Sequence, residues 1–414
     1  MKFCINFVIA ASLALAGAAA HADEERSMLS LKGFGSLGTS GTDNDSLRFR
    51  RDIKQGRGVG SGWGIDTDSR LGLQVDAEFN NAWHATVQWV ARNTTGDFVE
   101  QNLDWAFLRW RPLDDLDIRA GRMGFDVFML SEYRDVGYAY PWIRPPHEFY
   151  GGLPVYHFDG MDIAKKFALG EGQLTVKVFG GHSFNQVPIG LSEQSDQRYT
   201  LAGIKLAYEQ GNWNARIGYN YALNNLELSP LHPLLDALND PALSAVWPDA
   251  SGLAAKISAK DKAVHFTSVG LAYDDGLWLA QAEGSYIHSE LNVYRSVASG
   301  YLSLGRRVGK LTLYTLLGIS ETLNDRSSVS SPLAPVPALL ELRNAADLTL
   351  NTGGVDEKSI SLGLRWDVTE NIDLKTQWSH YWLGNNGSAL WLRPASGAAA
   401  DTVNVWSVGM DFIF

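Results

Sequence analysis

The sequence has almost no cysteine and, beyond its first residues, no long hydrophobic run. Its one cysteine, Cys4, lies close to the N-terminus. Disulfides, cysteine-ligated zinc, iron–sulfur clusters and a thiol nucleophile are therefore excluded for the rest of the chain. No second apolar stretch of about 20 residues occurs, so no transmembrane helix is expected there either.

The N-terminal segment has the pattern of a secretory signal peptide. Lys2 precedes an apolar run from Phe7 to Ala20, and an Ala-His-Ala sequence ends at Ala22. The run is too short for a membrane anchor, and the small residues are typical of a cleavage site. We therefore expect residues 1–22 to be a signal peptide and residues 23–414 to form the exported domain.

Acidic residues outnumber basic ones. The chain has 46 Asp and Glu against 35 Lys and Arg, which gives a formal net charge of −11. Because nucleic-acid binding depends largely on positive side chains that neutralise phosphates, we expect no nucleic-acid partner.

Several segments alternate apolar and polar side chains, as a strand with two different faces does. The pattern is clear over residues 83–92, 213–221 and 359–368, and again at the C-terminus, where Val408, Met410, Phe412 and Phe414 alternate with Ser407, Gly409 and Asp411. Strand side chains repeat every two residues, so the apolar set would face lipid and the polar set a lumen.

A soluble sandwich would show the same alternation, so the lengths of the connections are needed to distinguish it from a membrane barrel. Short turns and long connections alternate along the whole chain and divide it into sixteen segments of strand length. The short turns fall near residues 80–81, 112–115, 170–172, 210–212, 274–276, 309–310 and 369–371; the long connections fill roughly 40–67, 93–102, 125–158, 183–197, 223–263, 289–295, 323–357 and 383–401. Both chain ends then lie on the short-turn side, which is periplasmic in outer-membrane barrels.

These features predict an all-β fold, a transmembrane antiparallel β-barrel of about sixteen strands. An open sheet edge cannot exist in hydrocarbon, so the first and last strands must pair. Tryptophans near the predicted strand ends are expected in interfacial girdles, namely Trp83, Trp110, Trp213, Trp278, Trp366 and Trp382. The pattern leaves the faces of residues 161–168 unassigned, because Lys165 and Lys166 are adjacent. Prolines and leucines within 223–263 predict one or two short surface helices that cover part of the outer mouth.

The signal peptide, the sixteen strands, the terminal Phe414 and the long third external loop together resemble the general porins of Gram-negative outer membranes. That loop, residues 125–158, contains the fragment HEFYG at residues 147–151. The fragment is similar to the Pro-Glu-Phe-Gly stretch in the same loop of those porins, with histidine for proline and an inserted tyrosine. The resemblance implies a homotrimer in the bacterial outer membrane and recognition of Phe414 by the barrel-insertion machinery.

The resemblance also implies a water-filled channel for passive diffusion of small hydrophilic solutes and ions, constricted by the third loop. In the family, acidic residues on this loop face arginines on the wall. The loop candidates are Asp126, Glu132, Asp135 and Glu148, and the wall candidates are Arg70, Arg109, Arg119 and Arg122. Opposed charges would orient water and polar solutes, whereas closed salt bridges between the two sets are the alternative. Unit charges about 10 Å apart in water interact by only about 0.4 kcal/mol, so selectivity is expected to be mild.

Two further motifs each allow more than one interpretation of their role. The basic run Arg48, Arg50, Arg51, Lys54 and Arg57 in the first external loop could contact a neighbouring subunit, bind lipopolysaccharide phosphates, attract anions, or be solvated. Gly33, Gly35 and Gly38 fit a dinucleotide-binding pattern, but no helical pattern follows them. They are expected to allow close packing between subunits on the outer surface of the first strand.

Other functions have weaker support. A solute-specific porin with a saturable site for a sugar or an anion is the main alternative, since the third loop is aromatic and arginines are near. A barrel enzyme would need a spaced catalytic motif, and His84, His265, His288 and His380 do not form one. His147 with Glu148, and His157 with Asp159, lack a third spaced metal ligand. We therefore expect no enzymatic activity, no cofactor and no metal, and outer-membrane lipids and lipopolysaccharide as surroundings.

Overall fold

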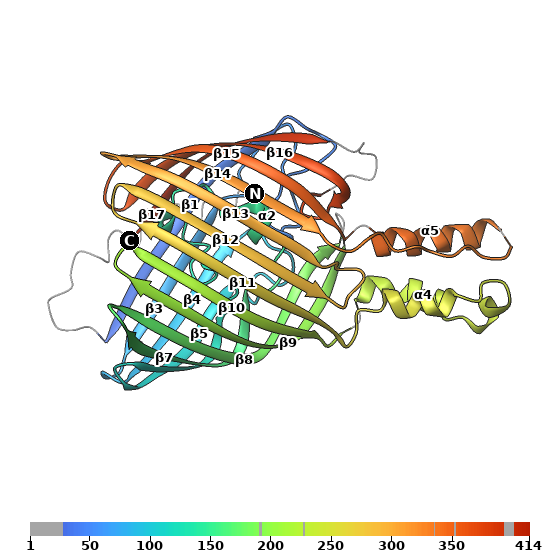
Figure 1. Cartoon of the computed structure of the whole chain (residues 1–414), viewed down its shortest axis with the longest axis horizontal. Helices are drawn as coiled ribbons and strands as arrows, with labels where there is room; N and C mark the ends of the chain where they lie inside the picture. The colour runs from blue at the N-terminus through green and yellow to red at the C-terminus, as the bar shows by residue number, and fades with distance from the viewer. Residues whose placement is uncertain (1–27, 190–192, 227, 335, 352, 393–400) are drawn as a thin grey trace.

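The computed structural model describes residues 28–414 except residues 190–192, 227, 335, 352 and 393–400. The predicted signal peptide lies outside the described residues. The chain forms one antiparallel sheet of seventeen strands (Figure 1), one of which, β2 (Trp63–Gly64), has only two residues and pairs with the end of the first strand. The other sixteen strands form the wall of a barrel, which confirms the predicted fold class and strand number.

The wall strands follow one another in sequence order around the barrel. They are β1 (Leu29–Thr42), β3 (Arg70–Glu78), β4 (Trp83–Arg92), β5 (Leu103–Leu113), β6 (Leu116–Gly124), β7 (His157–Leu169), β8 (Gly172–Ile189), β9 (Glu193–Gln210), β10 (Trp213–Asn224), β11 (Lys262–Asp274), β12 (Trp278–Ser289), β13 (Val297–Val308), β14 (Leu311–Thr322), β15 (Val355–Asp367), β16 (Ile372–Ser388) and β17 (Thr402–Ile413). β1 pairs with β17 on one side and with β3 on the other, so the sheet closes on itself.

All seven predicted short turns lie between strands, but one long connection was predicted too long. β8 and β9 are paired from Gln173 opposite Glu209 to Ile189 opposite Glu193. Most of residues 183–197 are therefore strand. Polar residues occupy both faces there, for example Asn185, Gln186 and Asp196. A ladder that leaves the lipid no longer needs an apolar face, and the alternation that marks a strand ends before the strand does.

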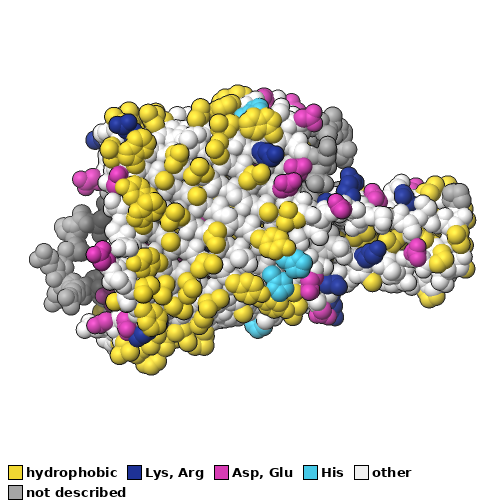
Figure 2. Space-filling model, viewed as in Figure 1, with side chains coloured by type: hydrophobic (Ala, Val, Ile, Leu, Met, Phe, Trp, Pro, Cys, Tyr) yellow, Lys and Arg dark blue, Asp and Glu magenta, His cyan; other side chains and the backbone are white. Residues whose placement is uncertain are grey.

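The lipid-facing and lumen-facing sets agree with the alternation. On β17, Val408 is 50% exposed, whereas Ser407 and Asp411 are buried. Hydrophobic side chains are spread over the barrel wall, while charged ones gather toward its two ends (Figure 2). The predicted girdle tryptophans are exposed, and the rings of Trp83 and Trp110 stack on neighbouring strands.

The structure assigns the faces that the sequence left open on β7. Met161, Ile163 and Phe167 are exposed, so Lys165 shares the outer face with them. It lies near the turn, where its ammonium contacts Asp115 at 2.6 Å. A lysine at the end of a spanning strand reaches past the hydrocarbon, so its charge does not have to be buried in lipid.

Aromatic rings fill the space above glycines on neighbouring strands. A Cβ on Gly33 or Gly35 would lie 2.1 or 2.4 Å from the rings of Phe414 and Phe412, which belong to the other end of the chain. The space that we expected to admit a neighbouring subunit is thus occupied within the chain, and Gly38 faces Asp68 instead. The glycines are needed at the seam between the first and last strands, as in aromatic rescue of strand glycines.

Two long outer loops form a projecting tower. Loop L5 (residues 225–261) contains α3 (His232–Leu238) and α4 (Ala250–Ile257), which confirms the predicted helices, together with the short turns η2 (Ser229–Leu231) and η3 (Pro241–Ala245). Loop L7 (residues 323–354) contains α5 (Pro337–Asn351), which was not predicted. Buried residues of all three helices share one apolar cluster. Figure 1 shows α4 and α5 extending away from the barrel rather than across its mouth.

Among the described residues, no helix is both long enough and apolar enough to cross a bilayer.

Candidate functional site

The third outer loop, L3 (residues 125–156), lies inside the barrel. It contains η1 (Gly137–Ala139) and α2 (His147–Tyr150). Its backbone and side chains bond to inward-facing residues on opposite sides of the wall, including Arg70 of β3, Ser268 of β11 and Lys375 of β16. Because these strands surround the lumen, the loop crosses it, and the candidate site is the space between L3 and the wall.

Asp126, at the start of L3, is held by three cations of the wall. Its carboxylate accepts from Lys177 of β8 at 2.9 Å and from Lys205 of β9, and it pairs with Arg216 of β10 at 2.8 Å. The aspartate is almost fully buried. Burial alone would raise the pKa of Asp126, but the charges of Lys177 and Arg216 hold it well below its usual value.

Glu132 makes the second attachment and is more accessible. Its carboxylate bonds to Arg119 of β6 at 2.9 Å and to Lys177 at 3.0 Å, and its side chain remains 35% exposed. Arg119 also donates to Asp162 of β7 at 3.0 Å. Glu132 is thus the loop acid most available to a solute that passes this side of L3.

Asp135 makes the third attachment. It bonds to Arg92 of β4 at 2.9 Å and lies 3.9 Å from Arg51 of the first outer loop. Burial acts to raise the pKa of Asp135, and the charges of Arg92 and Arg51 outweigh it, so the group stays ionised. Arg70 donates to the backbone oxygen of Asp135 at 2.6 Å, not to its carboxylate.

The predicted residues therefore meet only in part. Among the predicted pairs of loop acid and wall arginine, Arg119–Glu132 is a closed salt bridge, the alternative to charges opposed across open water. Arg109 is on the lumen face but lies beside Asp117, at 3.9 Å, near the short-turn end. Glu148 is buried on another side of L3, against Gly318 of β14.

Arg122 is placed on the outer face of the barrel. It pairs in register with Asp159 and bonds to its carboxylate at 2.8 Å. Asp159 shares its strand face with the exposed Met161 and Ile163, whereas Arg119 is on the opposite face of β6 with Asp162. Arg122 is therefore separated from L3 by the sheet itself, and we leave it out of the lumen set.

The cations that hold L3 most directly were not predicted. Lys177, Lys205 and Arg216 occupy lumen positions on three successive strands, each between lipid-facing residues. Strand alternation alone could have identified them as lumen-facing, since each lies between apolar residues of its strand. It could not show that they lie at the depth of Asp126.

The opposite side of L3 is mainly apolar, although the buried carboxylate of Glu283 on β12 accepts from the Tyr150 hydroxyl and from the backbone N–H of Met129. Phe128 and Phe149 contact each other with ring centroids 4.4 Å apart, and Phe149 also contacts Tyr301 of β13. Lumen-facing Phe266 of β11 and Leu316 of β14 belong to the same buried cluster. A lumen of this size is expected to be polar, so packing against L3 accounts for these side chains.

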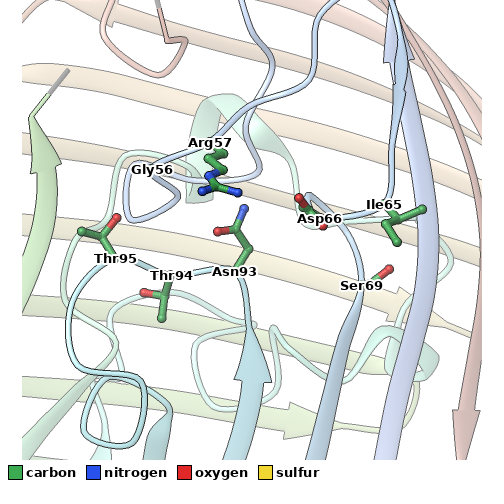
Figure 3. Close-up of a pocket in the computed structure, with 8 residues that line it drawn as sticks. All are labelled: Gly56, Arg57, Ile65, Asp66, Ser69, Asn93, Thr94 and Thr95. Carbon is green, nitrogen blue, oxygen red and sulfur yellow. The ribbon is translucent and has the colours of Figure 1, made fainter. Parts of the chain in front are cut away.

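One cavity lies near the outer loops on the charged side of L3, toward β4–β10, and another lies at the short-turn end between L3 and β11–β15. Figure 3 shows one of about 510 Å³ between the first two outer loops, where the side chain of Arg57 points toward Asn93 and Asp66 and Thr95 lie on either side. A second, of about 410 Å³, is lined by Tyr138, Tyr140 and Arg365 among others and lies toward the short-turn end. Between L3 and β4–β5, beside Glu132, a gap of about 10 Å³ has room for about one water molecule.

The basic run of the first outer loop is mostly internal. Arg50 donates to the backbone oxygens of Leu390 and Ala389, and Lys54 donates to Gln101 and Asn185. Arg51 donates to the backbone oxygen of Arg134 in L3. These three side chains tie the first loop to L3 and to other outer loops, a use that differs from all four alternatives drawn from the sequence. Arg48 and Arg57 are exposed.

The four histidines considered for catalysis do not meet at one site: His265 and His288 are neighbours on β11 and β12, whereas His84 and His380 lie on β4 and β16. His265 Nδ1 lies 2.7 Å from Tyr219 Oη and its ring contacts His288, His380 bonds to Asn404, and His84 lies 3.9 Å from Glu78. Within the described ranges, no group of three or more His, Cys, Asp or Glu side chains has an arrangement that could hold a metal ion.

Comparisons with known proteins give the fold. No protein-family model and no curated protein matches the sequence. OmpF of Salmonella typhi, solved in complex with daunomycin, is 13% identical and superposes with a TM-score of 0.54 over 93% of this chain and 97% of that chain. An anion-selective porin from Comamonas acidovorans is 12% identical, with a TM-score of 0.53 over 93% and 99%. The outer membrane channel DcaP of Acinetobacter baumannii is 13% identical, with a TM-score of 0.52 over 93% and 97%. The chain therefore shares the barrel fold of these proteins.

Proposed function

We propose that this protein is an outer-membrane porin that forms a water-filled channel for passive diffusion of small hydrophilic solutes and ions. The observation that carries the proposal is a closed barrel of sixteen strands whose inserted loop is tied to one wall by ion pairs, with one cavity near the outer loops and another at the short-turn end. Barrels of this strand number are wide enough for an aqueous bore. Structures named as porins or channels share the fold, which supports the same reading.

The proposal includes the expected cellular setting. Residues 1–22 would direct export and be removed, and residues 23–414 would form the barrel in the outer membrane, in contact with lipopolysaccharide. The protein would be a homotrimer, and Phe414 would be presented to the barrel-insertion machinery. It would not act as an enzyme, since the four histidines considered for catalysis do not meet at one site: only His265 and His288 adjoin, and His84 and His380 lie on other strands.

The charged side of L3 would provide the path. Glu132, Arg119 and Arg109 keep part of their side chains accessible and present both signs of charge to a passing solute. Such groups replace water of hydration for polar solutes, whereas an apolar solute gains nothing there. Since the charges are already paired, the remaining field is weak and the ion preference should be mild.

A solute-specific porin is the second candidate, and one cavity favours it. The 410 Å³ cavity at the short-turn end combines Tyr138, Tyr140 and Trp142 with Arg307 and Arg365. Aromatic faces and guanidinium groups are suited to a sugar or to a small anion. A binding site of this kind would make flux saturate with concentration.

Planar-bilayer recording tests the proposal. The mature protein is reconstituted and single-channel current is measured in symmetric and asymmetric salt, with and without candidate sugars and phosphate. Stepwise ohmic openings, in groups of three for a trimer, are expected. Saturable block by a sugar or phosphate would select the solute-specific form. A barrel that is shown to be folded and inserted, yet carries no current, would reject a channel function.

A further inference from the structure

A separate cavity of about 270 Å³ lies on the apolar side of L3. Its walls come from L3, from the outer halves of several strands and from the outer loops. The lining is mainly apolar and includes Phe149, Leu153, Phe266, Ile287 and Tyr294. The cavity is thus on the outer-loop side of L3 and is distinct from the charged path beside Glu132.

An apolar chamber is unexpected at these positions. Phe266 and Ile287 occupy lumen-facing sites on β11 and β12, where a water-filled bore would have polar side chains. Packing against L3 explains the buried rings, but it does not explain why space remains between them. Cores of proteins rarely leave voids larger than a water molecule, so a void of this size suits a ligand.

One polar side chain in the lining has an unused oxygen. Glu148, in α2, is only 3% exposed, and among the described residues its Oε1 has no hydrogen-bond partner. Gly318 gives it room, because a Cβ there would lie 2.6 Å from Oε2. A buried carboxyl oxygen without a donor is costly, so a ligand that supplies a donor would be favoured.

The polar groups nearest Glu148 are Ser359, whose hydroxyl can donate to the carboxylate, and Glu357, whose negative charge opposes that of Glu148. The carboxylate of Glu357 accepts a hydrogen bond from Trp391 Nε1 at 2.7 Å and lies 3.0 Å from His147 Nδ1. The guanidinium of Arg50, also in the lining, is bonded to backbone oxygens of the last outer loop. The site therefore has two acids, Glu148 and Glu357, close together, and among the described residues no lysine or arginine forms an ion pair with either of them. This combination favours a cation and disfavours an anion.

We propose that this cavity binds a small, largely apolar amine. The ammonium group of the ligand donates to Oε1 of Glu148, and its hydrocarbon body fills the space between Phe149, Phe266 and Tyr294. The proposal concerns binding on the outer side of L3 and goes beyond diffusion through the channel, so it can be measured whether or not the protein conducts.

The probe is 1-aminoadamantane, a compact hydrocarbon cage with one amine, and its comparison is 1-adamantanecarboxylate, which has the same cage and the opposite charge. The folded mature protein is placed in phosphatidylcholine nanodiscs, and binding is measured by titration calorimetry with empty nanodiscs subtracted. We expect saturable binding of the amine and at least about tenfold weaker binding of the carboxylate, since only the amine can form a charged hydrogen bond with Glu148.

Three variants locate the site. Glu148→Gln should weaken amine binding at least about tenfold. Glu171→Gln removes an exposed carboxylate in the short turn between β7 and β8 and should leave amine binding unchanged. Ala222→Leu, which adds bulk to a buried wall residue of the cavity, should abolish binding. Barrel folding of each variant is checked by its heat-modifiable mobility in gels; if Ala222→Leu does not fold, the two Glu→Gln variants still decide.

Several results would overturn the proposal. One is the same affinity for the amine in Glu148→Gln as in the wild type. Another is equal affinity for the amine and the carboxylate. Heat that empty nanodiscs account for entirely, or an equal loss in Glu171→Gln and Glu148→Gln, would also reject a site at Glu148. A silent channel in bilayers would bear on the proposed function alone.

Discussion

The two sides of L3 are attached to the barrel mainly by different interactions, ion pairs on one side and apolar packing on the other. Toward β4–β10, Asp126, Glu132 and Asp135 are bound by lysines and arginines of the wall. Toward β11–β14, Phe128 and Phe149 pack on the rings and aliphatic groups of the wall. Ion pairs specify position through geometry, whereas apolar contacts give stability roughly in proportion to the area buried.

This difference separates the two tasks of the loop. In the proposed channel, a polar solute would pass where the wall and the loop offer accessible charged groups, which is the side of Glu132 and Arg119. The apolar side excludes water from most of its contacts and so anchors the loop without forming part of that path. If the comparison is right, substitutions on the two sides should have different consequences for stability and for conduction.

The largest effect is expected at Asp126. Asp126→Asn leaves Lys177, Lys205 and Arg216 without their shared counter-charge in a buried position. Removing one partner of a buried ion pair typically costs about 3–5 kcal/mol. The free energy of unfolding, measured with urea in lipid vesicles, should fall by about that amount. Asp274→Asn breaks an exposed pair with Arg307 and should cost less than about 1 kcal/mol, so equal losses in both variants would contradict the assignment.

A smaller loss of stability is expected on the apolar side. Phe149→Ala removes ring contacts with Phe128, Tyr150 and Tyr301 and should lower the free energy of unfolding by about 3 kcal/mol. Ion selectivity should change little, because no charge is altered. Phe149→Leu keeps most of the buried volume and should lose less. A shift of the reversal potential without a loss of stability would show that this side is part of the path.

The next effect depends on pH. Burial and the charge of Glu357 raise the pKa of Glu148 from 4.5 to about 7. The folded state therefore binds the proton more tightly than the unfolded state, and stability falls as pH rises through this window. Glu148→Gln cannot titrate, so it should be more stable than the wild type at about pH 8, by up to about 3 kcal/mol, with no such gain at about pH 4.

Asp135→Asn is the matched control for this pH dependence. The pKa of Asp135 is lowered by Arg92 and Arg51 against the effect of burial, so the sign is opposite. Its wild-type carboxylate contributes stability that is present at neutral pH and is lost on acidification. Asp135→Asn should therefore be less stable than the wild type at about pH 8. Unfolding curves at both pH values check both variants. A change in stability of the same sign for both variants at about pH 8 would contradict the opposite pKa shifts of Glu148 and Asp135.

The smallest effect is expected on ion selectivity. Glu132→Gln should shift the reversal potential in a salt gradient toward anion preference, and Arg119→Ala toward cation preference. Each shift should correspond to less than about 1 kcal/mol, because the site is in contact with water and salt. Arg122→Ala alters a charge on the outer face and should leave the potential unchanged. A shift with Arg122→Ala as large as with Arg119→Ala would put both arginines in the path.

The fold could be predicted because lipid imposes a strict rule on side chains. Alternation on strands such as β4, β10 and β15 exists only because one face meets hydrocarbon, and it identifies each strand within the membrane. Outside the membrane, strands need no apolar outer face, and the alternation is no longer required. The outer ends of β8 and β9 and the helix α5 obey no such constraint, and neither was predicted.

The candidate site could be predicted only in part, for a related reason. The acids of L3 were found because a resemblance pointed to the loop. Their partners Lys177 and Lys205 are single polar residues in ordinary strands, and only the three-dimensional path of L3 brings them to Asp126. Arg122 shows the converse error, since a charge near L3 in sequence is on the far face of its strand. The apolar lumen positions, such as Phe266, break the polar-inside rule and have meaning only beside the loop that covers them.

The glycine and phenylalanine contacts at the seam of the barrel have a consequence for how the chain folds. Ser36 and Asp411, which bond across this seam, are 375 residues apart, whereas every other wall strand pairs with its neighbour in the chain. Bringing such distant segments together costs about 5 kcal/mol in chain entropy, by the logarithmic dependence on loop length. The hairpins should form first and the ring should close last. Phe412 and Phe414 can enter the spaces over Gly35 and Gly33 only after the two ends have met, so they slow reopening and do not speed closure.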